Sequence, residues 1–210
     1  MKEHFSHRFI AVLLLFSAIV FLISCSTKKN TFTRRVYHNL TAHYNVYWNG
    51  KEALLEAENE LANNADDNYN RILPVFNYGS ESDANSIAPL LDRAIEKGSK
   101  TILKHSMEFG GKEYVKWIDD AYMLIGKSYF YKRDYYSARR SFNFVMKNYD
   151  ESSIRYDAML WLARSYIALE SFEKAEPLLN LVQKDALDGK VPNNAMRELP
   201  LVYANYLIIQ

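Results

Sequence analysis

The hydrophobic residues of the chain recur at intervals of three and four positions, a pattern typical of α-helices. Near the N-terminal end this pattern predicts one helix over residues 36–48 and another over 51–64. Asn49-Gly50 interrupts the pattern and predicts a break between them. The apolar positions are Val36, Leu40, Tyr44 and Tyr47 in the first segment, and Leu54, Ala57 and Leu61 in the second.

The following stretch, residues 63–82, has turn-forming residues at both ends and one short apolar run, Ile72–Phe76. It predicts a long ordered connector. A third helix is predicted over residues 87–108, because Ser86 is a typical N-cap residue and Gly110-Gly111 a typical stop.

Beyond residue 110 the sequence repeats itself at an offset of 37 residues. Each copy has a small residue, a tyrosine, an alanine and a large apolar residue at the same spacing. This resembles the tetratricopeptide repeat, a helical hairpin of about 34 residues. Repeats are predicted at about 119–152 and 156–189. The matched residues are Gly126, Tyr129, Ala138 and Phe142 in the first copy, and Ala163, Tyr166, Ala175 and Leu179 in the second.

The repeats predict an all-α, tetratricopeptide-type helical-hairpin solenoid. The small residues are expected where paired helices cross, because close approach needs short side chains. A weaker copy is suggested by the Tyr44-x8-Ala53 spacing, within the helical N-terminal region 36–110. An apolar helical run predicts a truncated third repeat from about residue 200, and the chain is therefore expected to be part of a longer protein.

Inner helices of such solenoids line a concave groove, which offers an extended binding surface. Lys127 and Arg164 occupy the same position in the two repeats and predict one basic groove residue, or rung, in each. Together they predict binding of an acidic or carboxylate-ended peptide. The alternative is that two aspartates on the same face neutralise them. The complete set of predicted groove residues is Lys127, Arg164, Phe130, Tyr131, Asp120 and Asp157.

The first residues have the composition of a secretory signal peptide. Basic residues precede a 15-residue apolar run, Phe9–Ile23, which is short for a transmembrane helix. The run ends in Leu22-Ile23-Ser24-Cys25, which resembles a bacterial lipobox. That resemblance implies cleavage after Ser24 and lipid attachment to Cys25, the sole cysteine. The alternative is a cysteine that merely follows an apolar run.

Residues 25–35 are polar and basic and predict an acylated tether. No acidic residue occurs between Glu3 and Glu52, and basic residues near a membrane are attracted to anionic lipid. In bacterial lipoproteins an Asp directly after the lipidated cysteine favours retention in the inner membrane, and an acidic stretch resembles a signal for export to the cell surface. Neither feature follows Cys25, which predicts the periplasmic face of the outer membrane.

Neither composition nor motifs indicate catalysis. The formal net charge is +1, which argues against a nucleic-acid partner. Phosphate-binding loops, a hydrolase Ser motif and a zinc HExxH motif are missing from the sequence. His38 and His43 lack a third metal ligand nearby, and His105 is expected to be a core histidine. We therefore expect no enzyme, no metal, no small-molecule substrate and no cofactor other than the lipid on Cys25.

Four features together resemble one family, the SprE/PorW tetratricopeptide lipoproteins of Bacteroidetes. They are LISC at 22–25, TRRVYHNLTAHYNVYWNGKEAL at 33–54, NRILPVF at 70–76 and the repeat pair at 119–189. The resemblance implies a periplasmic outer-membrane lipoprotein that serves type IX secretion and gliding motility. Its implied role is a scaffold that links periplasmic and outer-membrane secretion-system proteins.

Other functions remain open at this point. One is a general envelope repeat lipoprotein, for example one assisting outer-membrane barrel assembly. The others are a glycan-binding lipoprotein and the N-terminal part of an envelope hydrolase with a catalytic domain beyond residue 210.

Overall fold

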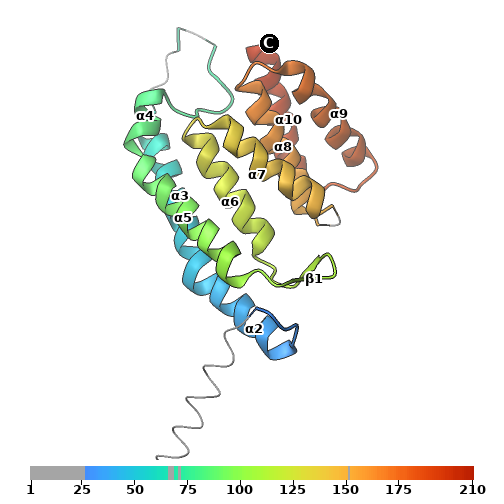
Figure 1. Cartoon of the computed structure of the whole chain (residues 1–210). Coiled ribbons are helices and arrows are strands. Elements are labelled where there is room, and N and C mark those ends of the chain that lie inside the picture. The colour runs from blue at the N-terminus through green and yellow to red at the C-terminus, as the bar shows by residue number, and fades with distance from the viewer. Residues whose placement is uncertain (1–26, 66–68, 71, 151) are drawn as a thin grey trace, which may run out of the picture.

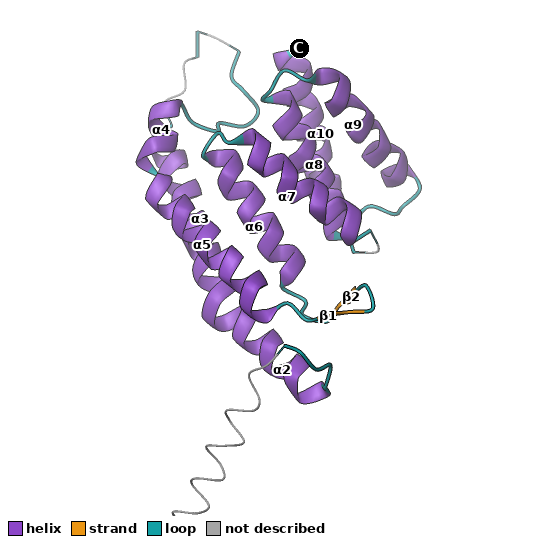
Figure 2. Cartoon of the chain, viewed as in Figure 1, coloured by secondary structure: helices purple, strands orange, loops and turns teal. Residues whose placement is uncertain are grey.

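The fold is an all-α solenoid of stacked helical hairpins, as predicted (Figures 1 and 2). The computed structural model describes residues 27–210 except 66–68, 71 and 151, so the predicted signal peptide and Cys25 lie outside the described residues. Helices make up 73% of the structure. The elements are α2 (Phe32–Thr41), the π-helical η1 (Ala42–Tyr47), α3 (Trp48–Asn63), α4 (Glu81–Ser86), α5 (Ala88–His105), β1 (Glu108–Phe109), β2 (Lys112–Glu113), α6 (Ile118–Tyr131), α7 (Tyr135–Asn148), α8 (Ile154–Ile167), α9 (Phe172–Leu187) and α10 (Asn193–Ile209).

The helices pack as successive antiparallel pairs. Helix α3 pairs with α5, α6 with α7, and α8 with α9, while each pair also packs on the next. Helix α10 lies against α8 and α9. Strands β1 and β2 form a short antiparallel hairpin whose turn is Gly110-Gly111. In Figure 1 the pairs follow one another from the N-terminal to the C-terminal end of the molecule.

The small residues of the two repeats lie at the predicted helix crossings. Ala138, Ala163 and Ala175 are fully buried. A Cβ atom added to Gly126 would lie 2.5 Å from Cε1 of Phe142, so only glycine fits there without movement of that buried ring. The spacing of small and aromatic residues is thus a packing requirement.

The turn inside each repeat also has the same conformation. Arg133 and Glu170 are 37 positions apart, and both adopt a left-handed backbone, with φ of 63° and 55°. In the first turn the amide of Asp134 donates to the carbonyl of Tyr129, and in the second Ser171 donates to Tyr166. Both bonds satisfy carbonyls left open at a helix end.

The N-terminal region differs from the prediction. One continuous helical run, α2–η1–α3, replaces the two predicted helices, and Asn49-Gly50 lies inside it. The Asn49 side chain donates to the carbonyl of Asn45, one turn earlier, at 2.8 Å. Gly50 is buried where α3 meets its neighbours, since an added Cβ would lie 2.9 Å from Cβ of Lys97. The suggested repeat copy at Tyr44-x8-Ala53 is therefore wrong.

Three predicted boundaries need correction. The tether ends before residue 35, because α2 begins at Phe32, after Thr31 in an extended conformation. Ser86 does not cap α5: it is the last residue of α4, and Ile87 is the N-cap of α5. Ser80 caps α4, where its side chain accepts from the amide of Asp83, and Asp83 completes a capping box. Helix α5 ends at His105, before the glycines of the β-turn.

The third repeat begins earlier than predicted. Helix α10 begins at Asn193 instead of about residue 200. The offset of 37 residues in fact continues into it, since Ala121 and Ala158 are followed by Ala195, which is also buried. Pro200 takes the position that Gly126 has in the first repeat. Proline inside a helix removes an amide donor and usually indicates a helix boundary, so the predicted start of this helix is too late.

Candidate functional site

The predicted groove lies between α3, α6 and α8, and we call it the inner groove. Asp120, Lys127 and Asp157 line it as predicted, around a cavity of about 150 Å³. Helix α3 adds Lys51 and Glu58, which the sequence analysis had not assigned to this groove. Carboxylates thus face the predicted basic residue from three helices.

Arg164 is buried instead of forming an open rung. It is only 4% exposed, and its guanidinium forms an ion pair with Glu198 of α10. It also lies 4.2 Å above the ring of Phe76 and 4.4 Å above that of Trp161. The charge of Arg164 is therefore used within the fold and is not presented to a partner.

The aromatic wall of the groove is covered by the chain itself. Phe130 is 1% exposed, and the ring of Tyr78 packs edge-on against it at 4.7 Å. Tyr78 also contacts Tyr131, with the ring centroids 6.2 Å apart. Phe76 packs against the hydrophobic core of α8, α9 and α10. The connector between α3 and α4 thus fills the part of the inner groove predicted to hold a peptide.

Glycine is required where this connector leaves the groove. Gly79 has φ of +73°, and an added Cβ would lie 2.8 Å from Cδ2 of Leu61. Its carbonyl accepts a hydrogen bond from the Arg133 guanidinium at 2.9 Å. The α6–α7 turn therefore holds the end of the connector in place.

Burial dominates the electrostatics of the inner groove. It raises the pKa of Asp120 to about 6, with a further contribution from the nearby charge of Asp119. Burial also raises the pKa of Glu58 and of Asp157, while it lowers that of Lys127. The positive charge of Lys127 lowers the pKa of Glu58 and Asp157, and their negative charges raise the pKa of Lys127, so each group partly offsets the effect of burial on the other. The structure thus favours the alternative in which groove carboxylates neutralise the basic residues.

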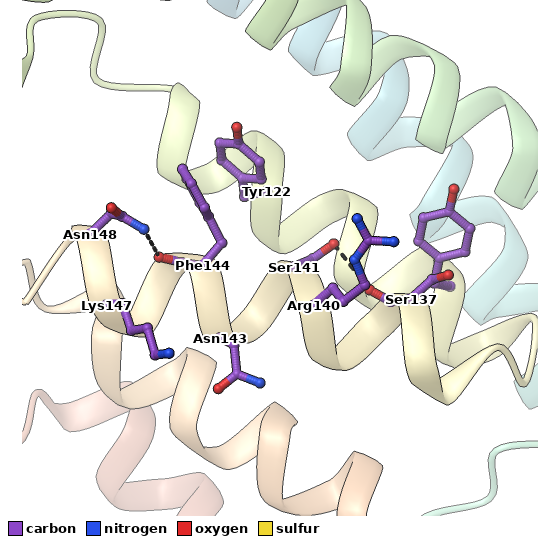
Figure 3. Close-up of a pocket in the computed structure, with 9 residues that line it drawn as sticks. Tyr122, Ser137, Arg140, Ser141, Asn143, Phe144, Lys147 and Asn148 are labelled. Atoms are coloured by element: carbon purple, nitrogen blue, oxygen red, sulfur yellow. Dashed lines mark hydrogen bonds between the residues drawn. The ribbon is translucent and has the colours of Figure 1, made fainter.

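A second surface, which the sequence analysis missed, lies between α6 and α7. We call it the α6–α7 pocket (Figure 3); its volume is about 640 Å³. Tyr122 faces Phe144, with ring centroids 4.2 Å apart. The amide of Asn148 is fixed by a hydrogen bond to the carbonyl of Phe144 at 2.8 Å. The lining residues are Tyr122, Tyr129, Ser137, Arg140, Ser141, Asn143, Phe144, Lys147 and Asn148.

Arg140 and Lys147 make this pocket basic, and no carboxylate is among its lining residues. Both lie on the same side of α7, because residues seven positions apart are two helical turns apart. An adjacent depression of about 410 Å³ shares Phe144 and is lined by Glu108, Glu113 and Asp150, among others. The face therefore carries a basic patch beside an acidic one.

The histidines have structural surroundings. His38 and His105 are buried, and their Nδ1 atoms lie 3.1 Å apart, so one ring donates a hydrogen bond to the other. The ring of His43 stacks on Trp117 at 3.8 Å. Among the described residues, no group of three or more His, Cys, Asp or Glu side chains is arranged to bind a metal ion.

Comparison with known protein families and with curated proteins found no match. In the part of the chain that the structure describes, none of the helices combines the length and hydrophobicity needed to cross a membrane. Function must therefore be argued from the fold, its surfaces and the sequence motifs.

Proposed function

We propose that this chain is a periplasmic, outer-membrane-anchored lipoprotein that acts as a protein–protein interaction scaffold in type IX secretion and gliding motility. The lipobox LISC at 22–25 and the resemblance to SprE/PorW lipoproteins support the location and the system. The helical-repeat fold supports a binding role without catalysis, because stacked hairpins offer extended surfaces to partners.

The observation that carries the binding role is the α6–α7 pocket. It combines two tyrosines and Phe144 with Arg140 and Lys147, and aromatic residues and arginine are the types that contribute most to protein interfaces. We therefore assign partner binding to this pocket in place of the inner groove, part of which the connector fills. Its charge fits an acidic segment of a periplasmic or outer-membrane secretion protein.

Reversing the charge of the pocket tests the binding role. Arg140→Glu with Lys147→Glu should reduce co-purification of periplasmic partners, protein secretion and gliding, while the melting temperature stays close to wild type. The matched control is Lys184→Glu with Arg197→Glu, which reverses two exposed charges on α9 and α10. Equal effects of the two double variants, or no effect of either, would contradict the assignment.

The anchor has its own test. A palmitate analogue should label the wild-type protein and leave Cys25→Ala unlabelled. Labelling of the alanine variant would show that the lipid is attached elsewhere.

A further inference from the structure

An apolar stripe remains exposed along α2 and η1. Phe32, Val36, Leu40 and Tyr44 are 78%, 41%, 53% and 66% exposed, and we call them the N-terminal stripe. Together they line one open depression of about 630 Å³, to which Tyr114 and Trp117 contribute further aromatic surface. An apolar surface of this kind on one helix face indicates an interaction site.

The π-helical segment helps to keep Tyr44 in line with the three residues of α2 that precede it. In an α-helix of 3.6 residues per turn, side chains four positions apart drift steadily around the axis. The wider turn of η1 holds more residues, which offsets the drift between Leu40 and Tyr44. His38, Ala42 and Val46 meanwhile face the core.

The charges around the stripe point to the chemistry of its occupant. The depression is lined by Arg35 and Lys116 and by no carboxylate. Arg35 lies 4.1 Å above the ring of Tyr114, so its charge sits beside the aromatic surface. The sequence from residue 4 to residue 51 contains no Asp or Glu. Aromatic and aliphatic residues flanked by Lys and Arg are typical of helices that lie in a membrane interface.

We propose that the N-terminal stripe lies on an anionic lipid bilayer, with its apolar side chains at the boundary between headgroups and acyl chains. Arg35 and Lys116 then lie at the level of the lipid phosphates. The inference rests on the proposed lipid anchor at Cys25, which keeps the stripe close to the membrane.

Chain length and shape agree with this placement. The seven residues from Cys25 to Phe32 reach at most about 25 Å, and the stripe is about 18 Å long. Helix α2 lies at the end of the molecule far from the C-terminus (Figure 1). Contact through α2 therefore leaves the C-terminal helices α9 and α10 at the end of the molecule away from the bilayer.

A depth measurement on the full chain tests the proposal. Leu40→Cys and Tyr44→Cys, each labelled with an environment-sensitive fluorophore, are reconstituted into vesicles of three parts zwitterionic to one part anionic phospholipid. Lipid-borne spin labels quench nearby fluorophores. Both labels should shift to the blue and lose at least half of their emission, whereas a label at Lys184→Cys on exposed α9 should change little. The proposal is overturned if the stripe labels and the α9 label behave alike.

Two controls separate the proposal from its alternatives. Adding Phe32→Glu and Val36→Glu to labelled Tyr44→Cys should reduce the quenching several-fold, because both changes place charge on the apolar face. A label that is already shielded without lipid, more strongly at higher protein concentration, would show that a second copy covers the stripe and would overturn the proposal.

Failure of the proposed anchor and failure of the proposed membrane contact give different results in this experiment. Cys25 is the sole cysteine, so labelling of the wild-type chain by the fluorophore would show that Cys25 is free and that the proposed anchor is wrong. In that case the stripe is measured in a Cys25→Ser background, where the difference between stripe and α9 labels still decides the proposal.

Discussion

The N-terminal pair α3–α5 and the repeat pairs α6–α7 and α8–α9 solve the same packing problem with different connections. In the repeats, two helices meet through a short turn with a left-handed residue, and a small residue lies at the crossing. In α3–α5, Gly50 provides the close approach, but the chain between the helices is long. That extra length reaches the inner groove, where Phe76 and Tyr78 pack against the repeats.

The comparison shows why equivalent positions in a repeat need not have equivalent roles. Lys127 and Arg164 occupy the same repeat position, yet Arg164 is sealed by Phe76 and Glu198 while Lys127 faces Glu58 and a small cavity. The neighbours that make the two residues differ come from outside their own repeats, from α3, the connector and α10.

Reversing the charge of Arg164 should have the largest effect. Arg164→Glu would place a buried carboxylate beside Glu198, so we expect a loss of about 3–5 kcal/mol in the free energy of unfolding, measured by urea denaturation. The control Arg140→Glu, at an exposed site on α7, should change it by less than about 0.5 kcal/mol. Similar values for the two variants would mean that Arg164 is accessible after all, as the sequence had suggested.

The buried histidine pair should make the N-terminal part sensitive to acid. Burial, with His38 as the next contribution, lowers the pKa of His105 to about 4 from 6.5. Between these pH values the unfolded chain binds a proton that the folded chain does not, so stability falls as the pH is lowered. The full pKa difference of His105 between the unfolded and the folded chain corresponds to about 3 kcal/mol in the free energy of unfolding.

Acid stability also depends on Asp120, whose raised pKa of about 6 makes the folded chain more stable as the pH is lowered. Comparing wild type with His105→Gln isolates the contribution of His105, because Asp120 is the same in both. Urea denaturation between pH 7 and pH 4 should show a smaller acid loss for His105→Gln than for wild type. Parallel curves would show that the pair does not control acid stability.

Overpacking the repeat crossings should cost somewhat less. Ala138→Leu and Ala175→Leu insert a larger side chain at fully buried positions, and each should reduce the free energy of unfolding by about 1–3 kcal/mol. Lys184→Leu on exposed α9 serves as the control. Equal small losses at all three sites would contradict the packing of the repeats.

The sequence predicted the repeats well because their signal is local. Small and aromatic residues at fixed spacing, such as Gly126 and Phe142, meet within one hairpin. The inner groove was predicted only in part: Asp120 and Asp157 line it as expected, but Glu58 and Glu198 come from distant segments, α3 and α10. Nothing in the spacing of Phe76 or Tyr78 indicates that they cover Arg164 and Phe130.

Near the N-terminus, local signals misled the prediction for another reason. Asn49-Gly50 is a common turn sequence, but here a hydrogen bond to Asn45 and close contact with α5 favour a continuous helix. The apolar spacing of Val36, Leu40 and Tyr44 was correctly helical, yet these residues are exposed. Periodicity identifies an apolar face, and it does not say whether protein or another surface covers that face.

The smallest expected effect tests the equivalence of the repeat turns. Glu170 is exposed and has a left-handed backbone, which costs a non-glycine residue about 1–2 kcal/mol. Glycine avoids that cost but loses about 0.5–1 kcal/mol through the greater freedom of the unfolded chain. Glu170→Gly should therefore stabilise the protein by about 0.5–1 kcal/mol in urea denaturation, whereas Glu170→Ala keeps the strain and should change little. Arg133→Gly at the equivalent turn should gain less, because it also removes the hydrogen bond to the Gly79 carbonyl. Equal gains at the two turns would show that the connector is not held by Arg133, and that the α3–α5 pair is less firmly joined to the repeats than these contacts imply.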